Sequence, residues 1–341
     1  MRPGRPRRLA AACCLAACMA GFGLGVWRLL GALQTHYPTG RRPDQSHALV
    51  SLPGTLVVAQ GGALYRLRGQ SFTALTGTKG RWTQPAPIPG HAGLIAASQT
   101  INFSNLVAMA ADGTGRRLLT HDAAPAQADN HWAYYPRVSP DGRTLFYAYD
   151  LHDPQASYDV TFAIMSQPLS GGPLTQWTVP HPYTGGDVQP VPLPGGGLIY
   201  AKWSIDTTGH TYAQLWLQSG PGQAGVALTT PAADCQEPAL SPNGRLLAMI
   251  CVDARAQQDS LTVAGFNGRT LGPRRVLATG PLPASPTWSP SGTQLCFLAP
   301  VGRLGPFQLW WLRNPLAHHP EAPVQVTTGL DLTATAAVAW S

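Results

Sequence analysis

Charge is scarce in this sequence. Asp, Glu, Lys and Arg together make up only 11% of the 341 residues. Glycine and proline are abundant instead, and their 37 and 33 residues form about a fifth of the chain. Little charge combined with many turn-forming residues is typical of a compact all-β domain or of a disordered chain. Ten Trp, ten Tyr and eight Phe favour the folded alternative, because disordered chains contain few aromatic residues.

Acidic residues are absent from the first 43 positions, which contain seven arginines. Those arginines account for the formal net charge of +7, because the rest of the chain contains 16 acidic and equally many basic residues. The body of the protein is therefore neutral. A neutral body gives no support for nucleic-acid binding, and we expect no nucleic-acid partner.

Residues 1–33 are predicted to be an N-terminal membrane anchor or signal segment. An arginine-rich start is followed by an uncharged, apolar run from Leu9 to Trp27. A run of about 20 apolar residues can cross a bilayer as a helix. The arginines keep the N-terminus cytoplasmic, and Arg28 can reach the opposite interface. We therefore expect a single-pass protein of the cell membrane with its body outside the cytoplasm.

Two alternatives for this segment remain open. The stretch "LAAC" resembles a bacterial lipobox, in which Cys18 would be lipidated. Cleavage near Ala20 would instead release a secreted protein. All three interpretations place the body outside the cytoplasm, and residues 34–52 are predicted to be a polar tether.

A hairpin recurs along the rest of the chain. "RVSPDGRTLFYAYD", residues 137–150, contains a Ser-Pro-Asp-Gly turn between two strands. Pro suits the second position of such a turn, Asp the third, and Gly adopts the left-handed conformation that closes it. Related turns follow at intervals of 36 to 54 residues. Each interval holds about four short strands, the size of a propeller blade. The turn prolines are Pro53, Pro89, Pro140, Pro194, Pro242 and Pro290.

A second proline precedes five of these turns. Proline has no N–H to donate, so it is confined to edge strands or bulges, as expected of the innermost strand of a blade. These prolines are Pro85, Pro136, Pro190, Pro238 and Pro286. The later part of each repeat predicts a third strand and a short fourth strand that often ends in Leu-Thr, as in "FTALT" and "RRLLT".

The last residues complete the pattern. The chain ends in "AVAWS", with Trp340 and Ser341 in the register of Trp288 and Ser289. The first repeat begins without a first strand, so the terminal strand is predicted to supply it and to close the ring. The predicted fold class is therefore all-β, a monomeric six-bladed β-propeller over residues 53–341, preceded by one transmembrane or signal helix.

The Ser-Pro-Asp-Gly hairpin, the preceding proline and the closing Leu-Thr strand resemble the TolB-like propeller repeats of bacterial envelope proteins. The resemblance covers residues 53–341 and implies a propeller in the periplasm. The N-terminal α/β domain of TolB has no counterpart in the sequence, which puts a role in the Tol–Pal system in doubt.

Candidate binding residues lie in two loops that lead into first strands, "KGRWTQP" and "ADNHWAYYP". We call such loops approach loops. Propellers generally bind ligands on this face, and flat aromatic surface combined with polar groups is typical of binding sites. The alternative is that the aromatic side chains only pack on the rim. The candidates are Arg81, Trp82, Gln84, His131, Trp132 and Tyr134. The insertion at residues 150–160 is expected at the same end of the strands.

Asp187 and Glu237 are the candidates for an enzymatic alternative. Both precede first strands, where side chains reach the channel mouth, and propeller enzymes hold an axial metal with such acids. The competing interpretation is that they cap turns. A G-x-S-x-G elbow, required by the peptidases related to these propellers, does not occur, and neither does a D-x-D-x-D-G calcium loop. His318 and His319 are interpreted as solvated rim residues.

Cys235 and Cys251 are predicted to face each other across the "SPNG" hairpin of the fifth repeat. With Ser241 opposite Arg245, facing residue numbers add up to 486, which includes this pair. A disulfide is one outcome in an oxidising compartment, and two buried thiols are the other. Counting from Pro238 predicts a hydrogen-bonded position for the pair. Cys296 is predicted to be a free, buried thiol.

The sequence therefore predicts a membrane-tethered extracytoplasmic propeller that acts as a non-catalytic binding module for a protein or glycan partner, without a cofactor. The alternative is a propeller hydrolase or lyase with an axial metal site.

Overall fold

The computed structural model describes residues 40–151, 161–253, 258–303, 305–317 and 321–341. The chain divides into two units, Met1–Gly40 and Arg41–Ser341, and the description below concerns the second. The predicted anchor or signal segment lies outside the described residues, as do most of the 150–160 insertion, His318 and His319. None of the helices in the described ranges is long and apolar enough to cross a membrane.

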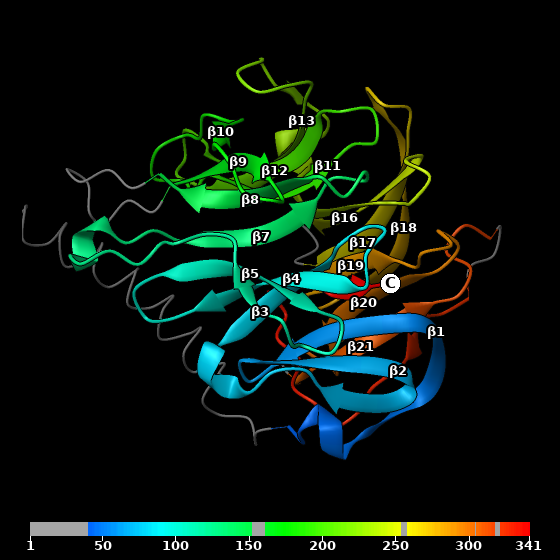
Figure 1. Ribbon diagram of the computed structural model, residues 1–341. Coiled ribbons are helices and arrows are strands. Elements are labelled where there is room, and N and C mark those ends of the chain that lie inside the picture. The colour runs from blue at the N-terminus through cyan, green and yellow to red at the C-terminus, as the bar shows by residue number, and fades with distance from the viewer. Residues whose placement is uncertain (1–39, 152–160, 254–257, 304, 318–320) are drawn as a thin grey trace, which may run out of the picture. The chain divides into compact units, whose positions relative to one another are not determined.

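The described residues form six antiparallel β-sheets (Figure 1). The first sheet has three strands in the order β2-β1-β23, and the other five have four strands each. Blade one consists of β1 (His47–Gln60), β2 (Ala63–Ala74) and β23 (Ala339–Trp340). Blade two consists of β3 (Trp82–Pro87), β4 (Gly93–Gln99), β5 (Ser104–Ala110) and β6 (Arg117–Leu118). Blade three consists of β7 (Ala133–Val138), β8 (Thr144–Asp150), β9 (Phe162–Pro168) and β10 (Thr175–Gln176).

The last three blades repeat this order. Blade four consists of β11 (Asp187–Pro192), β12 (Leu198–Ile205), β13 (Thr211–Gln218) and β14 (Val226–Ala227). Blade five consists of β15 (Cys235–Leu240), β16 (Leu246–Asp253), β17 (Gln258–Phe266) and β18 (Leu271–Gly280). Blade six consists of β19 (Ala284–Trp288), β20 (Leu295–Pro300), β21 (Phe307–Leu312) and β22 (Val324–Gln325). Short 3-10 helices are η1 (Pro43–Gln45), η2 (Thr78–Gly80), η3 (Gln127–Asp129) and η4 (Pro231–Ala233).

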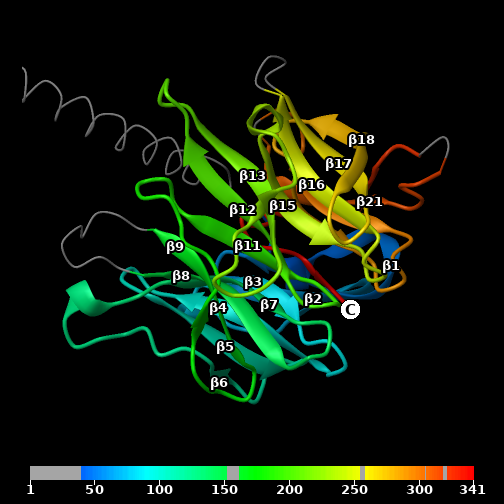
Figure 2. The same ribbon diagram turned by 90° about the horizontal axis from the view of Figure 1, so that it is seen from above.

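The first strands of the blades form a closed inner ring, and Figure 2 labels four of them, β3, β7, β11 and β15. Each contacts the next in the order β23, β3, β7, β11, β15 and β19, and β19 contacts β23 again. Apolar side chains fill the spaces between the sheets. The predicted all-β six-bladed propeller is therefore confirmed for the described residues.

The Ser-Pro-x-Gly turns are held by their own side chains. In blade three the N–H of Ser139 donates to the carbonyl of Thr144 (2.8 Å), and the N–H of Thr144 donates to Ser139 Oγ (2.9 Å). Asp141 Oδ1 accepts hydrogen bonds from Ser139 Oγ (2.5 Å) and from the N–H of Arg143 (3.1 Å). The serine and the acid thus satisfy backbone groups that the sheet leaves open, which explains why these residue types recur.

The Leu-Thr signature has an equally local cause. In five blades the buried threonine hydroxyl accepts a hydrogen bond from an N–H of the third strand, in place of a backbone carbonyl. In each case the residue before the threonine donates its own N–H to the carbonyl of the same third-strand residue. The threonine pairs are Thr76 with Leu64, Thr120 with Leu106, Thr178 with Ile164, Thr229 with Leu215, and Thr327 with Leu309, all at 2.9–3.0 Å.

The terminal strand closes blade one in the predicted register. Trp340 pairs with Leu56 as Trp288 pairs with Leu295, and Thr55 exchanges both backbone hydrogen bonds with Ser341 (2.7 and 2.8 Å). The indole N–H of Trp340 donates to the carbonyl of Pro53 (2.8 Å). First and last strands of the propeller are thus joined by backbone pairing.

The predicted boundary between tether and propeller is wrong. Residues 41–52 belong to the propeller unit, and β1 already begins at His47. Ala48 and Leu52 are buried in the core of blades six and one, and the N–H of Leu49 donates to the carbonyl of Val326 (2.7 Å). Burial alternates along this stretch, with Ala48 and Leu52 buried and Leu49 exposed between them, as in a half-buried strand rather than a solvated tether.

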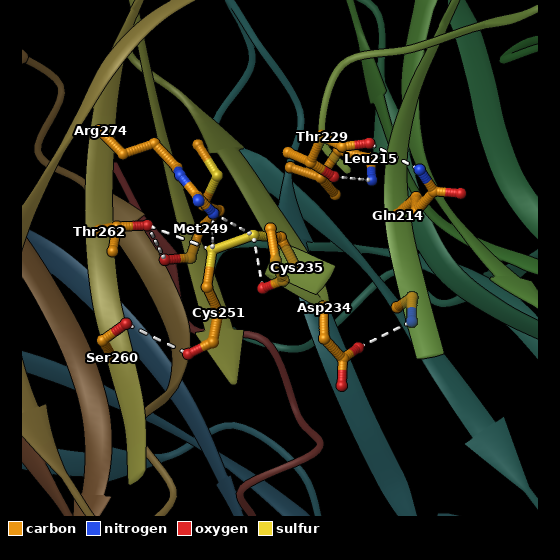
Figure 3. The surroundings of a disulfide bond; sticks show 12 residues. Gln214, Leu215, Thr229, Asp234, Cys235, Met249, Cys251, Ser260, Thr262 and Arg274 are labelled. Carbon is orange, nitrogen blue, oxygen red and sulfur yellow. Dashed lines mark hydrogen bonds between the residues drawn. A yellow bond between two sulfur atoms is a disulfide. The ribbon is translucent and has the colours of Figure 1, made fainter. Parts of the chain in front are cut away.

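Cys235 and Cys251 face each other and form a disulfide, with Cα atoms 4.1 Å apart (Figure 3). The N–H of Val252 donates to the carbonyl of Asp234 (3.0 Å), so the cysteines occupy the adjacent non-hydrogen-bonded position. The predicted hydrogen-bonded position is therefore wrong. A guanidinium nitrogen of Arg274 lies 3.2 Å from Cys235 Sγ. Cys296 is a buried free thiol, and burial raises its pKa.

Candidate functional site

A ring of five side chains surrounds the propeller axis. Each precedes the repeated proline, lies at a bulge in a first strand and has a left-handed backbone with φ between +52° and +56°. Non-glycine residues rarely adopt this conformation, and when they do they cluster at functional sites. The members of this axial ring are Gln84, Tyr135, Gln189, Glu237 and Ser285.

Hydrogen bonds within the axial ring join blade two to blade three, blade four to blade five, and blade five to blade six. The N–H of Tyr135 donates to Gln84 Oε1 (2.6 Å), and the N–H of Glu237 donates to Gln189 Oε1 (2.9 Å). The N–H of Ser285 donates to the carboxylate of Glu237. Each of these side chains thus satisfies a backbone donor that the bulge has removed from the ladder.

The segment before the terminal strand continues the axial ring through blade one. Ser285 Oγ donates to the carbonyl of Ala334 (3.0 Å), and Gln84 Nε2 donates to the carbonyl of Thr335 (3.5 Å). Closure of the propeller therefore also fixes polar groups at the axis.

Glu237 is the acid of the axial ring. Burial raises its pKa to about 7, although the N–H of Ser285 and the guanidinium of Arg137 both favour the charged form. The carboxyl of Asp259 adds to the increase. A carboxyl group that titrates near neutral pH can exchange a proton under ordinary conditions.

Replacing Glu237 by Gln is expected to change how stability depends on pH. In the unfolded chain the carboxyl of Glu237 has its ordinary pKa of 4.5, whereas in the folded protein it keeps its proton to about pH 7. The folded state therefore binds more protons in this window, and the stability of the wild type falls as pH rises through it. Glu237→Gln lacks this loss. In urea titrations at pH 4, 5, 6 and 8, the free energy of unfolding of the variant should therefore increase relative to that of the wild type as pH rises. A pH-independent difference would contradict the raised pKa.

The first approach loop does not present the predicted surface. Trp82 is buried, and its ring lies in the core between blades one and two and under the guanidinium of Arg116 (5.1 Å). The expectation that Trp82 is a binding residue is therefore corrected: it is a core residue. Arg81 is exposed beside it, at the end of η2 with a left-handed backbone.

The second approach loop does present an aromatic surface. Trp132 is half-buried and stacked on Tyr134, with ring centroids 5.9 Å apart. The hydroxyl of Tyr134 donates to Gln99 Oε1 (3.0 Å), and burial raises its pKa to about 12. His131 stacks on Tyr149 at 5.0 Å, and its Nδ1 lies 2.9 Å from the carbonyl of Asp150. These contacts hold the rings in place before any partner binds.

Asp187 does not reach the axis. It is completely buried, and its Oδ1 lies 3.1 Å from Lys202 Nζ. Lys202 also donates to the carbonyl of Val179 (3.1 Å). The predicted role of Asp187 at the channel mouth is therefore wrong, because its carboxylate is used in a buried ion pair.

Three members of the axial ring were not identified from the sequence. Tyr135, Gln189 and Ser285 occupy the same position as Gln84 and Glu237, directly before the repeated proline. Aligning the five prolines could have identified them. In the described part of the chain, no group of three or more His, Cys, Asp or Glu side chains is placed to hold a metal ion.

No protein-family model matches the sequence, and no curated protein matches it either. Solved structures match its fold. TolB from Acinetobacter baumannii has a TM-score of 0.63 and 14% identity, over 88% of this chain and 68% of that chain. A putative TolB from Agrobacterium tumefaciens has a TM-score of 0.56 and 15% identity, over 76% of this chain and 87% of that one. A chain of the nidogen/laminin complex has a TM-score of 0.57 and 13% identity, over 84% and 97% of the two chains.

The strand order and these similarities together describe the fold. The protein is a six-bladed β-propeller, as its strand order already shows. More particularly, its fold is similar to that of the two TolB structures.

Proposed function

We propose that the protein is a membrane-tethered, extracytoplasmic propeller that binds a protein partner without catalysis. The observation that carries the proposal is the half-buried, stacked pair of Trp132 and Tyr134 in the second approach loop. Protein interfaces are enriched in Trp, Tyr and Arg, and rings held in advance lose little conformational entropy on binding. Arg81 adds an exposed cation from the first approach loop.

The comparisons support a binding role at the level of the fold. One matching structure is a chain of a complex between two proteins, nidogen and laminin. The enzymatic alternative has less support, because Asp187 is used in an ion pair and the carboxylate of Glu237 accepts a hydrogen bond from the backbone N–H of Ser285.

The test compares partner capture by three forms of the full chain in membranes of the source cell. The double variant Arg81→Ala/Trp132→Ala removes the exposed arginine of the first approach loop and the half-buried tryptophan of the second. Trp310→Ala is the matched control, a half-buried tryptophan in blade six. We expect a cross-linked protein with the wild type and the control, and its loss by about tenfold or more with the double variant. Equal capture by all three forms would refute the site, and loss of capture on removal of glycans alone would identify a glycan partner.

The location forms part of the proposal and is supported by the arginines and the apolar run of the N-terminal segment. A reporter enzyme that is active only outside the cytoplasm, fused after Ser341, is expected to be active. Activity restricted to a cytoplasmic reporter would reverse the orientation.

A further inference from the structure

A cavity lies between blades two and three. It has a volume of about 470 Å³, which is within the range of small-ligand sites. Blade two contributes β6 and the residues that follow it, and blade three contributes β8, β9 and the loop after β9. Polar and aromatic side chains predominate in its wall. Among them are Thr120, His121, Asp122, Tyr147, Tyr149 and Gln167.

The buried carboxylate of Asp122 distinguishes this cavity. The residue is only 5% exposed, and its Oδ2 has no hydrogen-bond partner among the described residues. Leaving a buried polar atom without a partner lowers the stability of the fold, and more so when the atom is charged. Such a group in a native protein has an explanation, and a water, an ion, a ligand or a catalytic role are the usual ones.

The backbone holds Asp122 in this position. Its N–H donates to Asn105 Oδ1 (2.8 Å), and its carbonyl accepts a hydrogen bond from the N–H of His131 (2.9 Å). These two bonds fix the backbone of Asp122 at the wall of the cavity, so only the rotation of its own side chain remains free.

The charges around Asp122 do not neutralise it. Burial raises its pKa, and the nearby hydroxyl groups, that of Thr120 foremost, and the two neighbouring histidines oppose the increase without outweighing burial. Arg117 lies at the exposed rim, where its guanidinium donates to the carbonyl of Leu169 (3.1 Å). The cavity therefore favours a ligand that brings its own positive charge.

The aromatic residues of the wall are packed against their neighbours. Tyr147 is fully buried, and the ring of Tyr149 stacks on His131 and meets Tyr147 edge to face. Recognition of a cation therefore falls to the carboxylate of Asp122, which accepts N–H hydrogen bonds from an organic cation. We propose that the cavity between blades two and three binds a small molecule with a primary ammonium group, which Asp122 holds by a charge-assisted hydrogen bond.

The test measures binding of n-pentylamine to the full chain by titration calorimetry, with pentan-1-ol as the neutral probe of similar size. We expect saturable binding of the amine and none of the alcohol. Asp122→Asn keeps the shape of the side chain and should weaken binding of the amine about tenfold or more. Asp129→Asn changes an exposed acid seven residues further on and should bind like the wild type.

A second variant covers the case in which Asp122→Asn perturbs the fold. Leu174 is half exposed and lines the same cavity, so Leu174→Trp should obstruct it without affecting the core. Binding of the amine should be lost in this variant while the melting temperature is unchanged. The proposal is overturned if the wild type does not bind the amine, if the alcohol binds equally well, or if neither variant weakens binding. A peptide with one free lysine side chain and blocked ends distinguishes a protein-borne ammonium group from a free amine.

Discussion

Deletion of residues 333–341 is expected to open the ring and to lower the melting temperature more than any substitution discussed above. The deletion exposes the edge of β1, which pairs with β23 through Leu56 and Val57. It also removes the carbonyls to which Ser285 and Gln84 donate, so the axial ring loses its continuation through blade one. A single closed structure would become an open array with two exposed sheet edges, which also favours aggregation.

Trp340→Ala isolates the side-chain part of this effect. Trp340 is buried, and loss of a buried tryptophan side chain costs about 3–5 kcal/mol. Trp288→Ala is the matched control, because Trp288 has the same register and its indole N–H also donates to a backbone carbonyl, that of Ala239 (3.0 Å). Strand β19 is joined to β20 by a turn, whereas β23 has no turn to β1 and is held by its pairing and by the side-chain contacts of Trp340. We expect faster amide hydrogen exchange in β1 for Trp340→Ala than in β20 for Trp288→Ala. Equal exchange would contradict the closure argument.

The fold was predictable because its signals are local and repeated. Each Ser-Pro-x-Gly turn satisfies its own backbone groups, and each Leu-Thr ending replaces a backbone acceptor by a hydroxyl. Such motifs recur in the repeats of this sequence, and their spacing indicates the number of blades. The start of the propeller was less visible. His47 to Leu52 pairs with distant residues, such as Val326, and has no turn of its own to mark it.

The cysteine pairing was correct although two local assumptions behind it were not. The N–H of Ser241 donates to the carbonyl of Leu246 rather than pairing with Arg245, so the turn contains one more residue than predicted. The bulge between Gln236 and Ala239 then shifts the register back by one. A bulge of this kind depends on tertiary contacts at the axis, and its effect on register is not visible in the hairpin sequence alone.

The candidate site was predictable only in part for the same reason. Gln84 and Glu237 were selected for their position near the first strands, but the left-handed backbone that turns them toward the axis was not predicted. Trp82 was selected as a loop aromatic, yet its ring is in the core beside Arg116. Whether a loop side chain faces the core or the solvent depends on the neighbouring blade, which a single repeat does not show.

Lys202→Met is expected to destabilise the protein by about 3–5 kcal/mol at neutral pH, because it leaves the carboxylate of Asp187 buried and unpaired. Burial already raises the pKa of Asp187, and Lys202 is the main group that opposes this increase. Without Lys202 the pKa should rise further. In the unfolded state Asp187 has its ordinary pKa of 3.8 and is deprotonated above that pH, whereas in the folded variant it would keep its proton. The destabilisation should therefore be largest at neutral pH and should decrease as pH falls toward that value.

The double variant Asp187→Asn/Lys202→Met tests whether the unpaired charge causes the loss. Removing both charges from a buried pair is often nearly neutral, whereas removing one is costly. The amide introduced by Asp187→Asn has nearly the same shape as the carboxylate it replaces, and Met retains most of the apolar stem that packs near Trp216. Denaturant titrations at pH 7 should therefore show the double variant to be more stable than Lys202→Met alone. If the two variants are equally unstable, the loss comes from the packing of the lysine side chain. The attraction between the two charges then contributes nothing measurable to stability.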